Sequence, residues 1–254
     1  MNQKKSKPTV LITGASSGFG RAMAIKYHQN GHRLVLTARR FERLEQLKTE
    51  LGDDPAIYIA RVDVSDKASI DTFIAALPVD FKNIGILINN AGLALGVSDF
   101  ANSDERDFDT MIDTNIKGLI YMSKRVLPLM LAHRSGHIVN IGSIAASWPY
   151  PGGNVYCTSK AFVQQFSRTL RCDLVGKNIR VSNIEPGLAE TEFSVVRFKG
   201  DETKAKKLYA DRAPLIAEDI AEIVYFTTSL PGHVNINNIE VMPTCQSWAA
   251  FHIE

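Results

Sequence analysis

The chain has 254 residues, of which 45% are hydrophobic and 22% charged, and its formal net charge is +2. This length and composition allow the buried core of one α/β domain. Apart from Lys4, Lys5 and Lys7 the charges are dispersed, so no basic face for a nucleic acid is indicated. Every apolar run is shorter than the roughly 18 residues of a membrane span, and the first is too short for a signal peptide.

Cysteine and histidine usage predicts neither a disulfide framework nor a metal centre. An odd and sparse cysteine count is typical of a reducing cytosol, so we expect a cytoplasmic location. We interpret Cys157 as a small packed thiol, because buried cysteines are common. The histidines lack ligand spacing with cysteines or acids, so no metal is predicted. The residues concerned are Cys157, Cys172, Cys245, His28, His32, His133, His137, His233 and His252.

Apolar, β-rich runs alternate along the chain with helical patterns, which predicts βαβ units and a parallel sheet. Most of these runs are almost continuously hydrophobic, as expected for strands that are buried on both faces. The predicted strands are Thr9–Thr13, Leu34–Ala38, Ile57–Val62, Ile84–Asn89, His137–Ile141, Ile179–Ile184 and Ile236–Met242.

Helical spacing fills the segments between the strands. The apolar positions of Phe41–Leu51 predict a helix that stops at Gly52, and Ser65 or Asp66 can cap the next helix. Asn102 and Glu105 have capping-box spacing ahead of a long helical stretch. The sequence therefore predicts a single Rossmann-type, doubly wound α/β domain over residues 1–254, with a seven-stranded parallel sheet and a disordered start at residues 1–7.

A glycine-rich turn follows the first predicted strand directly and leads into a helix. A helix N-terminus presents unpaired N–H groups and a positive dipole end, which together bind phosphate. Glycines in such a turn let the backbone approach a pyrophosphate. The spacing is G-x-x-x-G-x-G, and an ordinary tight turn remains the alternative. The predicted cofactor-binding residues here are Gly14, Ala15, Ser16, Ser17, Gly18, Phe19 and Gly20.

Two arginines at the end of the second predicted strand indicate which dinucleotide binds. A site that prefers NAD places an acid there, on the ribose 2′-hydroxyl, whereas an arginine accommodates a 2′-phosphate. No acid lies between Thr37 and Phe41, and Arg39 and Arg40 can grip a phosphate bidentately. Solvated arginines at a helix start are the alternative. The pair predicts NADP as the cofactor.

A candidate catalytic set follows the fifth predicted strand. Tyr156 and Lys160 are four residues apart and share one helical face, and Ser143 precedes them at a strand end. The pKa of a free tyrosine is near 10, and a nearby ammonium lowers it by favouring the phenolate. Tyr156 could then exchange a proton with an alcohol or carbonyl oxygen as a hydride moves, while Ser143 orients that oxygen.

These motifs resemble the short-chain dehydrogenase/reductase family from about Pro8 to Trp248. The glycine turn, Asn89-Asn90-Ala91-Gly92 and the set of Ser143, Tyr156 and Lys160 carry the resemblance. It implies that Lys160 also holds the nicotinamide ribose and that Asn115 helps to position a proton-relay water.

The resemblance also implies cofactor contacts beyond the turn. Asp63, followed by Val64, would lie at the adenine, although Asp63 could equally be a turn residue. Thr191 would meet the nicotinamide carboxamide. The remaining implied contacts are Asn90, Tyr156, Lys160, Pro186, Gly187 and Leu188.

Shorter stretches narrow the resemblance to one group of that family. The segments 92–96, 147–156, 191–200 and 233–237 are similar to NADP-dependent 3-hydroxy acid dehydrogenases, which include serine and L-allo-threonine dehydrogenases. The resemblance implies oxidation of L-serine, L-allo-threonine or 3-hydroxypropionate and reduction of the matching oxo acids and semialdehydes. It also implies a homotetramer built partly through helices near 104–131 and 156–176.

A small carboxylate substrate needs a cation near the nicotinamide. Arg197 lies in the segment that closes over the substrate in this family, and a guanidinium matches a carboxylate in geometry. A surface arginine is the alternative. Trp148 and Tyr150 are expected to wall the substrate pocket, with core packing as the alternative. Ser143 and Tyr156 complete the predicted substrate contacts.

Two other functions remain open at this point. The same scaffold could reduce uncharged ketones or 3-ketoacyl groups, which would need a different pocket but the same chemistry. A catalytically inactive NADP-sensing protein is the second alternative, and the presence of Ser143, Tyr156 and Lys160 argues against it.

Overall fold

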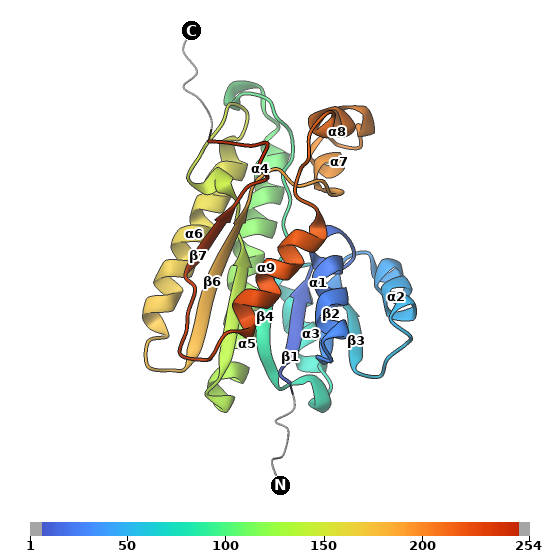
Figure 1. The fold of residues 1–254 in the computed structure, drawn as a ribbon, viewed down its shortest axis with the longest axis vertical. Coiled ribbons are helices and arrows are strands. Elements are labelled where there is room, and N and C mark those ends of the chain that lie inside the picture. Colours follow the sequence, from blue (N-terminus) through green and yellow to red (C-terminus); the bar gives the residue numbers. More distant parts are fainter. Residues whose placement is uncertain (1–6, 249–254) are drawn as a thin grey trace.

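The computed structural model describes residues 7–248, in which a seven-stranded sheet lies between two layers of helices (Figure 1). The strands follow the order β3-β2-β1-β4-β5-β6-β7, and every neighbouring pair is parallel. This confirms the predicted fold class. The expected disorder of residues 1–7 falls mainly on residues 1–6, outside the described range. The strands are β1 (Thr9–Thr13), β2 (Leu34–Ala38), β3 (Ile57–Arg61), β4 (Ile84–Asn89), β5 (Gly136–Ile141), β6 (Ile179–Pro186) and β7 (Asn238–Val241).

The central strands are buried on both faces because successive side chains point to opposite sides of the sheet. In β1, Val10 and Ile12 belong to one core, while Leu11 belongs to the other, and all three are fully buried. This explains why the strands appear in the sequence as unbroken apolar runs. The strand order reverses between β1 and β4, and open α/β sheets bind ligands at the carboxyl ends of the strands beside such a reversal.

One face of the sheet is covered by α1, α2 and α9, and the opposite face by α3, α5 and α6. The short helices α7 and α8 lie above the carboxyl ends of the strands in Figure 1. No helix within residues 7–248 is long and apolar enough to span a membrane. The helices are α1 (Gly18–Gln29), α2 (Phe41–Glu50), α3 (Lys67–Ala76), α4 (Glu105–Ile112), α5 (Leu119–His133), α6 (Asn154–Asp173), α7 (Phe193–Arg197), α8 (Glu202–Tyr209) and α9 (Ala217–Ser229).

The long helix expected from about residue 104 is interrupted. A π-helical segment, Asp113–Gly118, separates α4 from α5, and such single-turn distortions are frequent at functional sites. The predicted capping box was wrong, because Asp104 caps α4 by accepting a hydrogen bond from the backbone N–H of Arg106. Asn102 instead donates to Asp99 in a short 3₁₀ turn.

Candidate active site

The glycine-rich turn connects β1 to α1, where the sequence placed it. Gly14 and Gly18 have φ angles of +67° and +50°, a region that side chains rarely adopt. A Cβ at Gly20 would lie 2.4 Å from the carbonyl oxygen of Gly14, so the helix can approach the turn only with glycine there. Ser17 precedes α1 without a side-chain capping bond, which leaves first-turn N–H groups available to a phosphate.

Asn90 and Thr13 hold this turn in place. The Asn90 side-chain amide donates to the carbonyl oxygens of Thr13 and Gly14, at 2.9 and 3.2 Å. The Thr13 hydroxyl accepts from the backbone N–H groups of Asn90 and Ala91, both at 3.0 Å. Asn90 was predicted to contact the cofactor, and the structure shows that it also ties the end of β4 to the turn.

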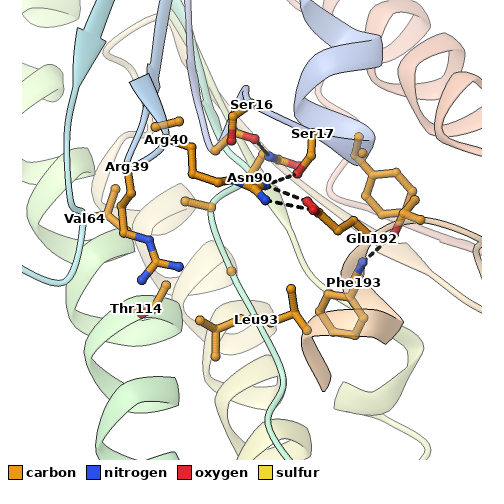
Figure 2. A pocket seen from close by; sticks show the side chains of 18 of the residues that line it. Ser16, Ser17, Arg39, Arg40, Val64, Asn90, Leu93, Thr114, Glu192 and Phe193 are labelled. Carbon is orange, nitrogen blue, oxygen red and sulfur yellow. Dashed lines mark hydrogen bonds and ion pairs between the residues drawn. The ribbon is translucent and has the colours of Figure 1, made fainter. Parts of the chain in front are cut away.

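A cleft of about 260 Å³ opens beside the turn, at the carboxyl ends of β1, β2 and β4 (Figure 2). Most of the predicted cofactor residues line it, although Ala15 is fully buried in the core and donates its N–H to Thr37 instead. Asp63 lines the cleft and is also a turn residue, since the N–H and hydroxyl of Ser65 donate to it. The predicted residues in the lining are Gly14, Ser16, Ser17, Gly18, Phe19, Arg39, Arg40, Asp63, Val64, Asn90 and Thr191.

The two predicted phosphate-binding arginines differ in their surroundings. Arg39 is exposed at the cleft, on the side of Val64 and Thr114, and forms no ion pair within residues 7–248 (Figure 2). Arg40 turns to Glu192 and forms a bidentate pair at 2.8 and 2.6 Å. Only Arg39 is therefore left with a guanidinium that is open to a 2′-phosphate.

Pro186 ends β6, Gly187 and Leu188 follow it, and none of the three lines the cleft. The N–H of Gly187 donates to Val241, and the N–H of Leu188 donates to the side chain of Gln246 at 2.7 Å. A Cβ at Gly187 would lie 2.4 Å from that same side chain. Their predicted contact with a cofactor stays a prediction.

The structure brings Asn115, Tyr156 and Lys160 together behind the inner end of the cleft. Asn115 lies in the π-helical segment and exchanges two hydrogen bonds with the backbone of Leu93, at 2.9 and 2.8 Å. Lys160 donates to the carbonyl oxygen of Ile141 at 2.9 Å, and its Nζ is 5.9 Å from the centre of the Tyr156 ring. All three side chains are at least nine-tenths buried.

Ser143 joins this set from the end of β5. Its hydroxyl accepts from the N–H of Ala145 at 3.1 Å and also acts on Tyr156 by hydrogen bonding that lowers the pKa of the phenol. Cys157 is buried beside Tyr156 in the same apolar cluster, which agrees with a packed thiol. The predicted catalytic residues therefore share one site.

Burial dominates the electrostatics of this set. It raises the pKa of Tyr156 above the usual value near 10, although Ser143 and the charge of Arg197 oppose the rise. Burial also lowers the pKa of Lys160 to about 8. The net direction for Tyr156 is opposite to the one expected from the sequence, because the dehydration of a buried phenolate outweighs the nearby cations.

The predicted substrate residues outside the catalytic set have different positions. The Arg197 guanidinium lies 5.0 Å from the centre of the Tyr150 ring and 5.8 Å from that of Tyr156, and its buried Nε has no hydrogen-bond partner within residues 7–248. Trp148 is 41% exposed, packs against Trp248 and donates to Glu240. Trp148 thus lies outside the lining of the cleft, and Tyr150 is the aromatic residue beside Arg197.

Sequence reasoning missed several residues of this site. Glu192 lines the cleft between Thr191 and Phe193, and Phe193 packs against Tyr156 with ring centres 5.7 Å apart. Arg43 on α2 also pairs with Glu192, at 2.9 Å. A single sequence offers no signal for a pair between residues about 150 positions apart.

Comparisons with known proteins place the chain in a family. A family profile described as short chain dehydrogenase matches residues 8–202. The chain belongs to the short chain dehydrogenase family. It is therefore an oxidoreductase that acts on CH–OH groups. It is 53% identical to the NADP-dependent 3-hydroxy acid dehydrogenase YdfG of Escherichia coli strain K12 over 245 residues, 96% of this chain and 98% of the relative. It is 50% identical to sulfoacetaldehyde reductase 2 of Chromohalobacter salexigens over 246 residues, 96% and 98% of the two chains.

Solved structures of this family superpose closely on the chain. A closed form of serine dehydrogenase complexed with NADP⁺ matches with a TM-score of 0.95 and 51% identity, over 97% of this chain and 99% of that one. Serine dehydrogenase from Escherichia coli matches with a TM-score of 0.83 and 47% identity, over 94% and 100% of the two chains.

Proposed function

We propose that the protein is an NADP-dependent dehydrogenase that oxidises the 3-hydroxyl of small 3-hydroxy acids and reduces the corresponding oxo acids and semialdehydes. The observation that carries this substrate class is the position of Arg197, whose guanidinium lies 5.8 Å from the ring of the proposed acid/base Tyr156. L-serine, L-allo-threonine and 3-hydroxypropionate are the proposed substrates. The cytoplasmic location expected from the cysteine usage and the homotetramer implied by the resemblance both stay predictions.

The residues of the cleft fit NADP. The first turn of α1 offers N–H groups to the diphosphate, and Arg39 offers an exposed cation to the 2′-phosphate. Asp63 and Val64 line the same cleft and would border the adenine. When it is bound, the nicotinamide supplies the acceptor or donor of the hydride.

Tyr156 is placed to move the proton of the reaction. Because burial raises its pKa, the phenol is protonated near neutral pH and is ready to donate its proton to a carbonyl oxygen during reduction. In the oxidation direction the substrate hydroxyl gives its proton to the phenolate, so this direction is favoured at higher pH. Ser143 orients the same oxygen, and Lys160 supports the phenolate by its charge below a pKa of about 8.

Arg197 supplies the cation for the substrate carboxylate. Its neighbours Tyr150 and Tyr156 are aromatic, and its Nε lacks a partner within the described residues, so an anion can satisfy the guanidinium. The names of the two relatives fit this interpretation, since a 3-hydroxy acid and sulfoacetaldehyde are both small anions.

Initial rates with NADP⁺ or NAD⁺ test the proposal directly. We expect turnover of the three hydroxy acids with NADP⁺ and much less with NAD⁺. Turnover of uncharged secondary alcohols alone would favour the alternative of a ketone or ketoacyl reductase. Tight NADPH binding without turnover of any substrate would favour the sensing protein.

Arg197→Met tests the substrate class. Loss of a charged hydrogen-bond partner should raise KM for L-serine by roughly tenfold to a hundredfold, with a smaller effect on an uncharged alcohol. The pH profile of oxidation should also shift to higher pH, because Arg197 lowers the pKa of Tyr156. Arg168→Met, on the exposed side of α6, is the matched control. Equal KM changes on charged and uncharged substrates would contradict the carboxylate role.

A further inference from the structure

Glu192 lines the cleft and links the segment after β6 to the start of α2 (Figure 2). Its carboxylate accepts two hydrogen bonds from Arg40, at 2.8 and 2.6 Å, and two from Arg43, at 2.9 and 3.1 Å. Arg40 also donates to the hydroxyl of Ser17 at 2.8 Å. A carboxylate between two guanidiniums and the phosphate-binding turn thus forms one connected group, which we term the Glu192 bridge (Ser17, Arg40, Arg43 and Glu192).

The bridge lies where a bound cofactor would have to pass. Ser17, Arg40 and Glu192 line the cleft, and a second, shallower hollow that includes Arg43 lies on the outer side of Ser17 and Glu192. The bridge therefore lies between the cleft and this outer hollow.

Glu192 also fixes its two neighbours in the chain. Thr191 faces the turn, and a Cβ at Gly18 would lie 3.4 Å from the Cβ of Thr191. Phe193 packs on the ring of Tyr156 from the other direction. An anchored Glu192 thus places Thr191 over the phosphate turn and Phe193 over the proton donor.

The ion pair between Arg40 and Glu192 gives the two arginines after β2, Arg39 and Arg40, different roles. Both terminal nitrogens of Arg40 are committed to the bridge, whereas Arg39 forms no ion pair in the described part of the chain. A bidentate arginine–carboxylate pair is both directional and stronger than a neutral hydrogen bond. Arg40 is therefore available to close the cleft and Arg39 to recognise a phosphate.

We propose that Glu192 is a positioning residue for the cofactor, and that its bridge to Arg40 and Arg43 closes the cleft and sets the rate of NADP(H) release. This inference rests on the proposed NADP dependence.

Stopped-flow measurement of NADPH release, followed by its fluorescence, tests the proposal. Glu192→Gln keeps the size of the side chain but removes its charge, so release should become about threefold to tenfold faster, as expected for loss of a partly exposed network of ion pairs. Glu190→Gln, an exposed acid two residues away, should leave release unchanged. Unchanged or slower release in Glu192→Gln would overturn the proposal.

Further variants separate the bridge from a general effect on folding. Arg40→Met should accelerate release as Glu192→Gln does, and the double variant should add less than the sum of the two, because both changes break the Arg40–Glu192 pair. Arg43→Gln should give a smaller increase and serves as the second variant if Glu192→Gln does not fold. Raising the salt to about 0.5 M should accelerate release more in wild type than in Glu192→Gln.

Arg39→Met should change cofactor preference without changing release, which is the opposite of what we expect for Glu192→Gln. It should reduce the preference for NADPH over NADH in equilibrium binding, with the release of NADH unchanged, whereas Glu192→Gln should accelerate release of both cofactors. Full additivity of Arg40→Met and Glu192→Gln would overturn the bridge. If wild type does not bind NADPH, the proposed function fails; if wild type binds NADPH and Glu192→Gln releases it at the wild-type rate, only this inference fails.

Discussion

The turn between β1 and α1 and the lid segment, residues 191–200, face each other across the cleft, but their geometry is fixed in different ways. The turn is set by backbone conformation, with glycines at positive φ and a Gly14 carbonyl oxygen that lies 2.4 Å from where a Cβ on Gly20 would be. The lid segment is held at both ends by charged side chains, with Glu192 paired to Arg40 and Lys199 paired to Asp107 at 2.7 Å.

The difference indicates which part of the site is rigid. Backbone geometry enforced by sterics changes little with salt, whereas partly exposed ion pairs weaken as salt is added. The phosphate-binding side should therefore be preformed, and the substrate side should open and close. Substitutions in the turn are expected to change cofactor affinity, whereas substitutions in the lid segment are expected to change NADPH release or KM.

We expect the largest effect, a loss of kcat, from a substitution in the catalytic set. Tyr156→Phe removes the hydroxyl that we propose exchanges the proton, and it should lower kcat by roughly a hundredfold to ten-thousandfold. The release rate of NADPH should change far less, because the turn and the Glu192 bridge remain. Tyr58→Phe, on β3 and remote from the cleft, is the control. A kcat within about tenfold of wild type would remove Tyr156 from the proton transfer.

Gly20→Ala tests whether the glycine turn between β1 and α1 is preformed. The new Cβ would collide with the Gly14 carbonyl oxygen and with the Asn90 amide 2.6 Å away, and overpacking of this kind costs about 1–3 kcal/mol. We expect lower thermal stability together with weaker binding of both NADPH and NADH. Gly232→Ala is the matched control, since nothing lies within 4 Å of its Cβ. Wild-type affinity in Gly20→Ala would mean that the turn adapts and is not preformed.

The same contrast explains how much the sequence could predict. Buried parallel strands leave continuous apolar runs, so β1, β2 and β4 were placed with the observed bounds. The glycine turn and the set of Ser143, Tyr156 and Lys160 follow from local motifs, and Asn115 follows from the family resemblance; the structure brings these four side chains together. These features depend on backbone geometry and on short spacings.

Features that depend on distant side chains could not be predicted. The pairing of Arg40 with Glu192 joins residues 152 positions apart, and it changes the expected role of Arg40. Burial determines the direction of the Tyr156 pKa, and the depth of a side chain is known only once the chain is folded. Trp148 bonds to Glu240 on β7, a contact that no local pattern indicates.

The smallest expected effect concerns the second anchor of the lid segment. Asp107→Asn keeps the shape of the side chain but removes the charge that pairs with Lys199, whose φ of 53° lies in the left-handed region. Lys199 is half exposed, so the pair should contribute no more than about 1 kcal/mol to the free energy of unfolding.

Because the backbone of Arg197 also accepts a hydrogen bond from Gly96, at 3.0 Å, the lid segment retains one contact with this loop when the ion pair is lost. We therefore expect KM for a hydroxy acid to rise about twofold to fivefold in Asp107→Asn, the range that corresponds to such a pair, with NADPH release unchanged. Asp109→Asn on the same helix is the control. Faster NADPH release in Asp107→Asn would show that the two anchors act together and that the lid segment moves as one unit over both cofactor and substrate.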